Sequence, residues 1–233
     1  MRLGGLQKLT LIDYPGKIAA TVFTIGCSFR CPFCHNPELV LPDYSGGVGS
    51  IKEEEFFDFL KNRQNKLEGV CITGGEPTVQ KDILEFMKKI KELGFAVKLD
   101  SNGTRPDILK QVFDNKLADF VSMDIKNSSS KYEKTAGVKV DPERIKLSVK
   151  LIQNSGIKYE FRTTVVPDFH EEEDFYEIGS WLKGSQKYAL QKFRDGGKLL
   201  DESIRKKLEN QKELDLEKIK KKIEKCFGEV EVR

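Results

Sequence analysis

The sequence lacks any apolar run long enough to cross a membrane, and residues 1–5 open no hydrophobic signal segment. It also lacks a marked excess of charge, because 40 Lys and Arg against 37 Asp and Glu leave a formal net charge of +3. This balance argues against the strongly basic surfaces that bind nucleic acids or membranes. We therefore expect a cytoplasmic protein with neither nucleic acid nor membrane as a partner.

Internal repeats, low-complexity linkers and a disulfide framework are missing as well. The five cysteines are odd in number and three of them are clustered, which favours a reducing compartment and a bound metal over disulfides. A chain of 233 residues is an ordinary length for one barrel-like domain. We expect a single domain over 1–233, with a core at about 17–194 and a C-terminal extension at about 195–233.

Short β-branched stretches alternate with amphipathic stretches along the chain. Strands are expected at 17–25, 69–73, 95–99, 120–123, 159–166 and 188–191. Helices are expected at 53–67, 81–93, 106–113, 142–154 and 171–182, followed by a helix at 214–227 and an edge strand at 229–232. Six parallel strands with right-handed crossovers are too few for the common eight-stranded barrel. The predicted fold is α/β: a partial, open (β/α)6 TIM-like barrel with a C-terminal helical extension.

Three cysteines within eight residues, Cys27, Cys31 and Cys34, form a C-x3-C-x2-C motif. Four ligands close an electron-carrier cluster or a structural zinc site, whereas a catalytic metal keeps one position open. Three thiolates therefore predict a 4Fe–4S cluster with one free iron. The alternative is a Cys3His zinc site that uses His35, which is disfavoured because His35 directly follows Cys34. The remaining cysteines, Cys71 and Cys226, are expected to be packing residues.

Polar residues follow the ends of successive predicted strands, where parallel barrels gather their reactive groups. They are Gly74, Gly75 and Glu76 after the second strand, Asp100, Ser101 and Asn102 after the third, Asp124 and Lys126 after the fourth, and Arg162, Thr164 and Gln191 on the last two. Taken singly, each has a plainer interpretation, since Gly-Gly before Pro is ordinary turn chemistry and Lys126 could be a solvated lysine. His170 lies in a polar stretch and is expected to be solvated.

The motif and two flanking segments, 10–17 (TLIDYPGK) and 34–39 (CHNPEL), resemble the anaerobic ribonucleoside-triphosphate reductase activating proteins. These are glycyl-radical-enzyme activases of the radical S-adenosylmethionine (SAM) superfamily, and the resemblance covers residues 3 to about 194. It implies SAM and a 4Fe–4S cluster as cofactors, with room for a monovalent cation. The implied contacts are Gly74, Gly75 and Glu76 with the amino group of SAM, Lys126 with its carboxylate, Ser101 and Asn102 with the ribose, Phe33 and His35 with the adenine, Arg162 and Thr164 with the nucleoside, Asp100 and Asp124 with the cation, and Gln191 nearby.

The resemblance also implies the activity. Such an enzyme takes an electron from a flavodoxin- or ferredoxin-type donor, cleaves SAM to a 5′-deoxyadenosyl radical and removes a Cα hydrogen from a glycine of its protein substrate, here anaerobic ribonucleotide reductase. One departure is Phe193, which stands where formate-lyase activases have a histidine. Three alternatives stay open: activation of another glycyl-radical enzyme, a small-molecule radical SAM enzyme such as a deazaguanine synthase, and a non-catalytic zinc or iron–sulfur binding module.

Overall fold

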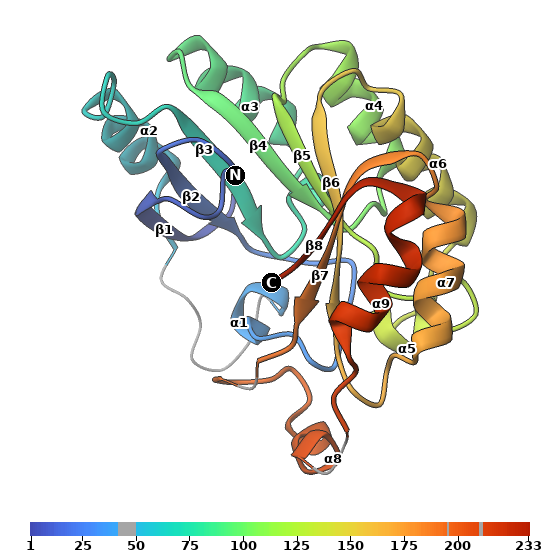
Figure 1. Ribbon diagram of the computed structural model, residues 1–233. Coiled ribbons are helices and arrows are strands. Elements are labelled where there is room, and N and C mark those ends of the chain that lie inside the picture. The colour runs from blue at the N-terminus through green and yellow to red at the C-terminus, as the bar shows by residue number, and fades with distance from the viewer. Residues whose placement is uncertain (42–49, 195, 210–211) are drawn as a thin grey trace.

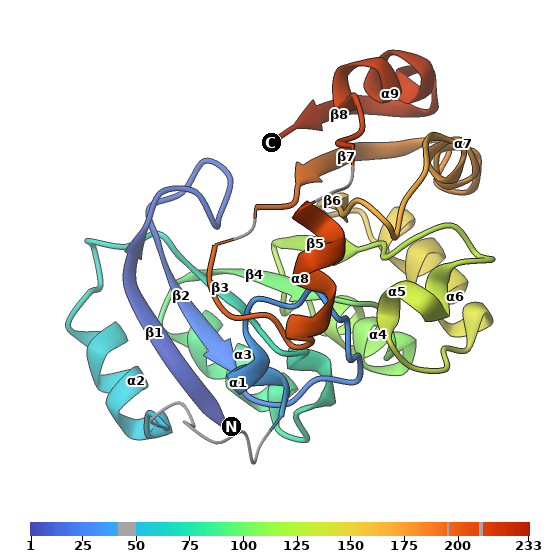
Figure 2. The same cartoon turned by 90° about the horizontal axis from the view of Figure 1, so that it is seen from below.

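A computed structural model describes residues 1–41, 50–194, 196–209 and 212–233 (Figure 1). Eight strands form one sheet in the order of the sequence. They are β1 (Leu3–Thr10), β2 (Ala19–Thr24), β3 (Gly69–Gly74), β4 (Ala96–Ser101), β5 (Phe120–Asp124), β6 (Lys158–Val165), β7 (Ser185–Lys192) and β8 (Phe227–Val232). Neighbouring strands run parallel except β1, which is antiparallel to β2. The strands follow an arc, and its ends, β1 and β8, do not pair with each other within the described residues (Figure 2).

Helices connect the parallel strands and lie mainly on the outer side of this arc (Figure 2). They are α1 (Pro37–Val40), α2 (Glu53–Lys61), α3 (Ile83–Glu92), α4 (Pro106–Asp114), α5 (Tyr132–Ala136), α6 (Pro142–Gln153), α7 (Glu172–Trp181), α8 (Arg205–Glu209) and α9 (Leu216–Ile223). The six predicted parallel strands and the open α/β barrel are confirmed. The described residues contain no helix long and apolar enough to cross a membrane.

The sheet is wider than predicted, because β1 joins one edge and β8 extends the other. Two consecutive glycines, Gly4 and Gly5, hid β1, since glycine weakens strand propensity. The structure explains Gly4: a Cβ there would lie 2.5 Å from the Leu39 side chain and 2.8 Å from that of Ile25. The glycine lets β1 approach α1 and the end of β2 closely.

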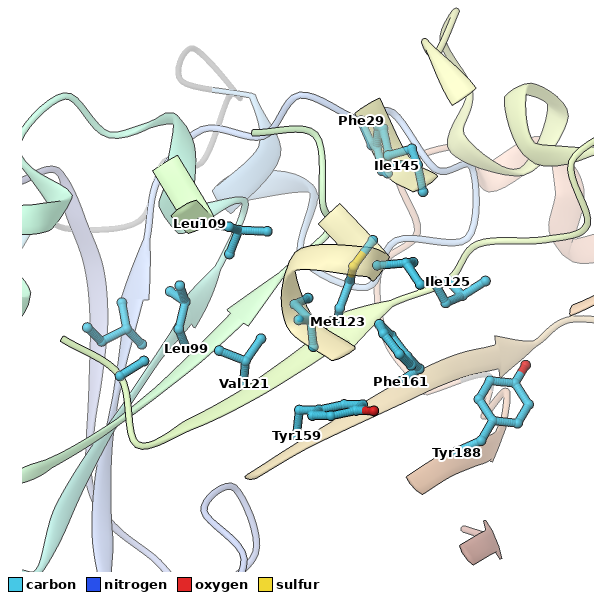
Figure 3. Packing of buried hydrophobic residues seen from close by; sticks show 14 of the residues in the cluster. Phe29, Leu99, Leu109, Val121, Met123, Ile125, Ile145, Tyr159, Phe161 and Tyr188 are labelled. Atoms are coloured by element: carbon cyan, nitrogen blue, oxygen red, sulfur yellow. The ribbon is translucent and has the colours of Figure 1, made fainter. Parts of the chain in front are cut away.

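The outer face of the sheet forms the hydrophobic core. Leu99 of β4, Val121 of β5 and Phe161 of β6 are fully buried against helix residues such as Leu109 of α4 and Ile145 of α6 (Figure 3). Burying one such side chain contributes about 1.5–3 kcal/mol. Because side chains alternate along a strand, this packing fixes the register and sends every second residue to the opposite face.

That opposite, concave face is polar. Its buried or half-buried positions, in register from β2 to β6, are Thr21, Cys71, Lys98, Asp100, Ser122, Asp124, Glu160 and Arg162. Charged groups are costly to bury unless they are paired. Their accumulation at the carboxyl ends of β4, β5 and β6 marks the part of the fold where a site can form.

Candidate active site

A cavity of about 240 Å³ opens at the carboxyl ends of strands β2 to β6. It is lined by every residue predicted for the site except Gln191: Cys27, Cys31, Phe33, Cys34, His35, Gly74, Gly75, Glu76, Asp100, Ser101, Asn102, Asp124, Lys126, Arg162 and Thr164. Phe29, Asn36, Val40, Thr73 and Pro77 complete the lining. Segments that are distant in the sequence thus meet around one space.

The cysteine loop, residues 27–34, follows β2 and is held by backbone contacts. Arg30 donates its N–H to the carbonyl of Ala136 at 2.8 Å, and its guanidinium donates to the carbonyl of Cys27 at 2.7 Å. Gly137, in a left-handed conformation with φ 70°, ends α5 against this loop. A Cβ at Gly137 would lie 2.0 Å from the Arg30 carbonyl oxygen, so glycine is required there.

The C-terminal extension also holds the cysteine loop, a contact that sequence reasoning missed. Leu200 donates its backbone N–H to the carbonyl of Cys34, and Asp201 donates to that of Pro32, both at 3.0 Å. Leu199 is buried in the hydrophobic core and anchors this segment. No side-chain motif marks such backbone contacts, so the sequence carries no signal for them.

Cys31 is buried, Cys27 and Cys34 are half-buried, and among the described residues no hydrogen bond joins these thiols to a cationic side chain. Burial, followed by the charge of Glu76, raises the pKa of Cys27 to about 12. Burial raises the pKa of Cys31 to about 11, although the charge of Lys126 opposes this shift, and it raises the pKa of Cys34. Thiolates bind metals and thiols do not, so a metal group entering the cavity would displace these protons.

Two glycines shape the end of β3 beside the cysteine loop. Gly74 has φ 115°, and a Cβ there would lie 2.3 Å from the backbone nitrogen of Thr24. At Gly75 a Cβ would lie 2.2 Å from the carbonyl oxygen of Gly26. These two glycines therefore allow β3 to pack closely against the backbone that precedes Cys27. The same lack of side chains would leave room for a ligand to approach the backbone.

Glu76 is the buried carboxylate of one wall of the cavity, which we call the Glu76 wall (Glu76, Thr78, Ser101 and Asn102). Its Oε1 accepts hydrogen bonds from the backbone N–H of Thr78 at 3.1 Å, from the Thr78 hydroxyl and from the hydroxyl of Ser101 at 2.9 Å. Its Oε2 accepts one from the backbone N–H of Asn102 at 2.5 Å. Burial raises the pKa of Glu76, and these neutral donors oppose the shift. No positive side chain contacts this carboxylate within the described residues.

A second group in the site consists of charged side chains, and we call it the ion-pair wall (Lys98, Asp100, Asp124, Lys126 and Arg162). All of them except Lys98 line the cavity. Arg162 donates to Asp124 at 2.5 Å and to Asp100 at 3.1 Å, and Lys126 donates to Asp124 at 2.9 Å. Lys98, whose side chain is only 3% exposed, is paired with Asp100.

Electrostatics in the ion-pair wall differ from those around Glu76. Burial by itself would raise the pKa of Asp124, but the charges of Arg162 and Lys126 outweigh it and hold that pKa far below its usual range. Arg162 and Lys98 likewise lower the pKa of Asp100 against the effect of burial. The charge of Asp124 raises the pKa of Lys126 although burial opposes it. All three side chains therefore stay ionised at neutral pH.

Aromatic rings border the cavity on its third side. The His35 ring stacks on Phe193 with centroids 5.0 Å apart and an interplanar angle of 16°, and Phe33 packs edge-on against Phe169. The Nε2 atom of His35 is buried and has no hydrogen-bond partner within the described part of the chain. Buried polar atoms in folded proteins nearly always have partners, so this atom marks a place for a polar ligand group.

Gln191 stands apart from the other predicted site residues, and His170 is placed differently from its prediction. Gln191 lies opposite Thr164 in the β6–β7 register, outside the cavity lining. His170 is buried rather than solvated, and its Nε2 is 2.8 Å from the carbonyl oxygen of Lys126. Burial lowers the pKa of His170. The polar sequence around it gave no sign that a turn of backbone would fold over this ring.

The family model described as the Radical SAM superfamily matches residues 21–182, which carry the cysteine loop and both walls of the cavity. The chain belongs to this superfamily. It is 36% identical over 239 residues to a Methanocaldococcus jannaschii protein provisionally named a glycyl-radical enzyme activating enzyme, covering 99% of this chain and 95% of that protein. It is also 29% identical to the pyruvate formate-lyase-activating enzyme of Clostridium pasteurianum over 71% of this chain and 69% of that one.

Among solved structures, this radical SAM enzyme is similar in fold to Streptococcus suis SuiB bound to S-adenosylmethionine. The TM-score is 0.66 at 15% identity, and the match covers 90% of this chain and 48% of the SuiB chain. The chain thus spans about half of that larger protein. These comparisons establish a radical SAM enzyme that is homologous to glycyl-radical enzyme activating enzymes. They support an enzyme rather than the non-catalytic binding module.

The donor set of this radical SAM enzyme fits the cofactors that its family implies, a 4Fe–4S cluster and SAM. Among the residues that the structure describes, no three His, Cys, Asp or Glu side chains converge closely enough for a single metal ion. A cube of iron atoms presents separate corners to separate thiolates, so cysteines spaced around one cavity suit a cluster better than a zinc ion. The unpartnered His35 nitrogen and the two oppositely charged walls suit SAM, which carries polar, cationic and anionic groups.

Proposed function

We propose that this radical SAM enzyme activates an anaerobic ribonucleoside-triphosphate reductase by installing a glycyl radical on it. Support comes from the TLIDYPGK and CHNPEL segments around the cysteine motif and from homology to glycyl-radical enzyme activating enzymes. Phe193 stands where formate-lyase activases have a histidine, which weakens the case for the formate-lyase branch and is compatible with the reductase branch. The proposed setting is the cytoplasm, where thiols stay reduced, with a flavodoxin- or ferredoxin-type protein as electron donor.

The observation that carries the binding part of this proposal is the charge of the two walls. The ion-pair wall has three cationic side chains and two carboxylates, which leaves one positive charge to be balanced. The Glu76 wall has one buried carboxylate held by neutral donors. An amino-acid zwitterion complements both, with its ammonium toward Glu76 and its carboxylate toward Lys126.

Each group of residues then has a role in the reaction. Cys27, Cys31 and Cys34 would hold the cluster, which together with SAM supplies the one-electron chemistry for hydrogen-atom abstraction. Glu76 and Lys126 orient the amino-acid end of SAM, while Ser101 and Asn102 lie within reach of its ribose. So reactive a centre requires that its target be fixed in position and that water and competing hydrogen donors be kept away while the substrate is bound.

The open side of the sheet supports a protein substrate. The sheet is open between β1 and β8, which are not paired with each other in the described residues, and an open sheet suits the entry of a loop. A flexible loop of another protein could enter, and a glycine in it has no side chain to obstruct its Cα. A glycine packed inside the reductase could not reach the cavity, so the substrate glycine must lie in a mobile segment.

The proposal is tested by electron paramagnetic resonance of the reduced, cluster-loaded enzyme mixed with SAM and the cognate reductase. A glycine-centred doublet is expected, and it should vanish when the reductase's radical glycine is replaced by alanine. Deuterium on that glycine's Cα should appear in the released 5′-deoxyadenosine. Turnover on a purine precursor without transfer from the reductase would instead favour the deazaguanine synthase alternative. A doublet on another glycyl-radical enzyme only would redirect the proposal to that partner.

A further inference from the structure

We infer that Lys98 supplies from within the chain the positive charge that the carboxylates at this site require, so that no monovalent metal cation is bound there. The inference concerns the SAM site and does not depend on which protein is activated. It differs from the resemblance-based expectation that Asp100 and Asp124 hold a monovalent cation.

The first observation is that every oxygen of the two carboxylates already has a cationic partner. Asp100 accepts from Lys98 on Oδ1 and from Arg162 on Oδ2. Asp124 accepts from Arg162 on Oδ1 and from Lys126 on Oδ2. Each of the four oxygens therefore already faces a positively charged donor. A metal ion would have to share such an oxygen with a cationic side chain, so like charges would repel across it.

The second observation is where Lys98 lies. Its side chain is 3% exposed, and its Nζ is 3.7 Å from the sulfur of Cys71 and 6.0 Å from the centre of the Phe120 ring. An ammonium buried in this way cannot leave the site without leaving Asp100 short of a partner. Cation–π contact with Phe120 adds a further favourable interaction for a positive charge at this position.

The third argument is charge balance when SAM is bound. Lys98, Arg162 and Lys126 carry three positive charges against the two of Asp100 and Asp124, so the carboxylate of the ligand brings the set to neutrality. A metal cation would add a fourth positive charge to a buried group that is already balanced, which is unfavourable. Lys98 and a monovalent metal ion are therefore alternatives for one role, and this chain uses the lysine. Lys98 acts as a positioning residue, since it reaches the ligand only through Asp100 and Arg162.

The test compares cluster-loaded wild type and Lys98→Ala in buffers of equal ionic strength that contain K⁺, Na⁺ or choline. Affinity for SAM is measured by isothermal titration, and thermal unfolding is recorded without SAM. Wild type should show the same affinity, within about twofold, in all three buffers. Lys98→Ala opens a space beside Asp100, so its affinity should fall roughly tenfold or more in choline and recover in K⁺ or Na⁺. The unfolding temperature of Lys98→Ala should likewise be higher in K⁺ or Na⁺ than in choline.

Matched variants separate this role from general effects of charge. Lys187 pairs with Glu229 at 2.9 Å and Glu231 at 2.7 Å away from the cavity, so Lys187→Ala should show no preference for K⁺ over choline. Lys98→Arg, which retains the charge, should stay insensitive to the cation. A wild-type enzyme whose SAM affinity falls tenfold when K⁺ and Na⁺ are replaced by choline would overturn the inference, even if Lys98→Ala fails to fold. So would Lys98→Ala protein that binds SAM like wild type in every buffer.

Discussion

The two walls of the cavity bury carboxylates in opposite ways. Glu76 is surrounded by neutral donors from Thr78, Ser101 and the Asn102 backbone, and burial raises its pKa. On the ion-pair wall, Asp124 is held by the charges of Arg162 and Lys126, which lower its pKa despite burial. Buried carboxylates thus occur in two settings. The Glu76 wall has no cationic side chain, whereas the ion-pair wall has three cationic side chains for two carboxylates.

This difference teaches how one small cavity can orient a zwitterion. Neutral hydrogen bonds stabilise a carboxylate without cancelling its charge, so the charge remains available to a cationic group of the ligand. The three cations of the other wall are fixed in place by their own carboxylates, so they need not reorganise when an anion arrives. Binding in the reverse orientation would set like charges against each other on both walls, which is unfavourable.

The largest effect is expected from the cysteine loop, which lines the same cavity as the two walls. Cys31→Ala should remove most iron after anaerobic reconstitution and abolish SAM cleavage, because two thiolates cannot hold the cluster. The matched control is Cys71→Ala, since Cys71 is fully buried outside the loop. Iron analysis and 5′-deoxyadenosine release measure the outcome. Full iron loading of Cys31→Ala, or stoichiometric zinc in place of iron, would contradict the cluster assignment.

The Glu76 wall should show two effects in a single variant. In Glu76→Gln an amide nitrogen replaces one carboxylate oxygen and must face either the Asn102 N–H or the Thr78 and Ser101 donors. Leaving such buried donors unsatisfied costs about 1–3 kcal/mol, so the free energy of unfolding should fall by that amount. Loss of the charge should weaken SAM binding roughly tenfold or more. Chemical denaturation and isothermal titration measure the two effects.

A ligand analogue identifies which group of SAM Glu76 recognises. If Glu76 binds the ammonium, an analogue without the amino group should bind wild type and Glu76→Gln with nearly equal affinity. An equal loss of affinity for both ligands would mean that Glu76 acts only by holding β3 and β4 together. The inference that its charge recognises the ammonium group would then be wrong.

The ion-pair wall should show the complementary result. Lys126→Met should weaken SAM binding about tenfold to hundredfold while the cluster stays intact, because one charge-assisted contact to the ligand carboxylate is lost. Asp124 keeps its bond to Arg162 in this variant, so folding should be retained. Decarboxylated SAM provides the control, since its affinity should hardly change between wild type and Lys126→Met. Undiminished SAM binding by Lys126→Met would remove Lys126 from the site.

Much of this arrangement could be predicted from the sequence, for identifiable physical reasons. Strand periodicity located β2 to β7, and parallel topology then required that residues after successive strands share one edge. That logic brought Cys27, Glu76, Asp124 and Lys126 together without any contact being known. Strand β1 was not predicted because Gly4 and Gly5 are poor strand formers, although the packing of β1 requires a small residue at Gly4.

The hydrogen-bond and ion-pair partners of the site residues could not be predicted, because they depend on side-chain geometry across strands. From the sequence, Lys98 had no role beyond that of a strand residue. Lys98 and Asp100 are two residues apart, so both lie on the concave face of the sheet, and this spacing was the only hint in the sequence that they form a pair. Nothing in the sequence showed that Glu76 would be held by four neutral hydrogen bonds or that Leu200 would support the cysteine loop. Such contacts depend on how distant segments meet in three dimensions.

The smallest effect is expected at Phe193, which belongs to neither wall. Its ring stacks on His35, and its backbone N–H is fixed to the Val165 carbonyl at 3.1 Å, so it holds the imidazole against the cavity. Loss of one aromatic contact is worth about 0.5–1.5 kcal/mol, so Phe193→Ala should weaken SAM binding roughly twofold to tenfold, as measured by isothermal titration. Phe193→His retains a flat ring and should bind almost as wild type does. If both variants lost affinity equally, an interaction other than stacking would position His35. If neither lost any, the His35 ring would contribute little to holding the adenine, and the charged walls would account for SAM recognition.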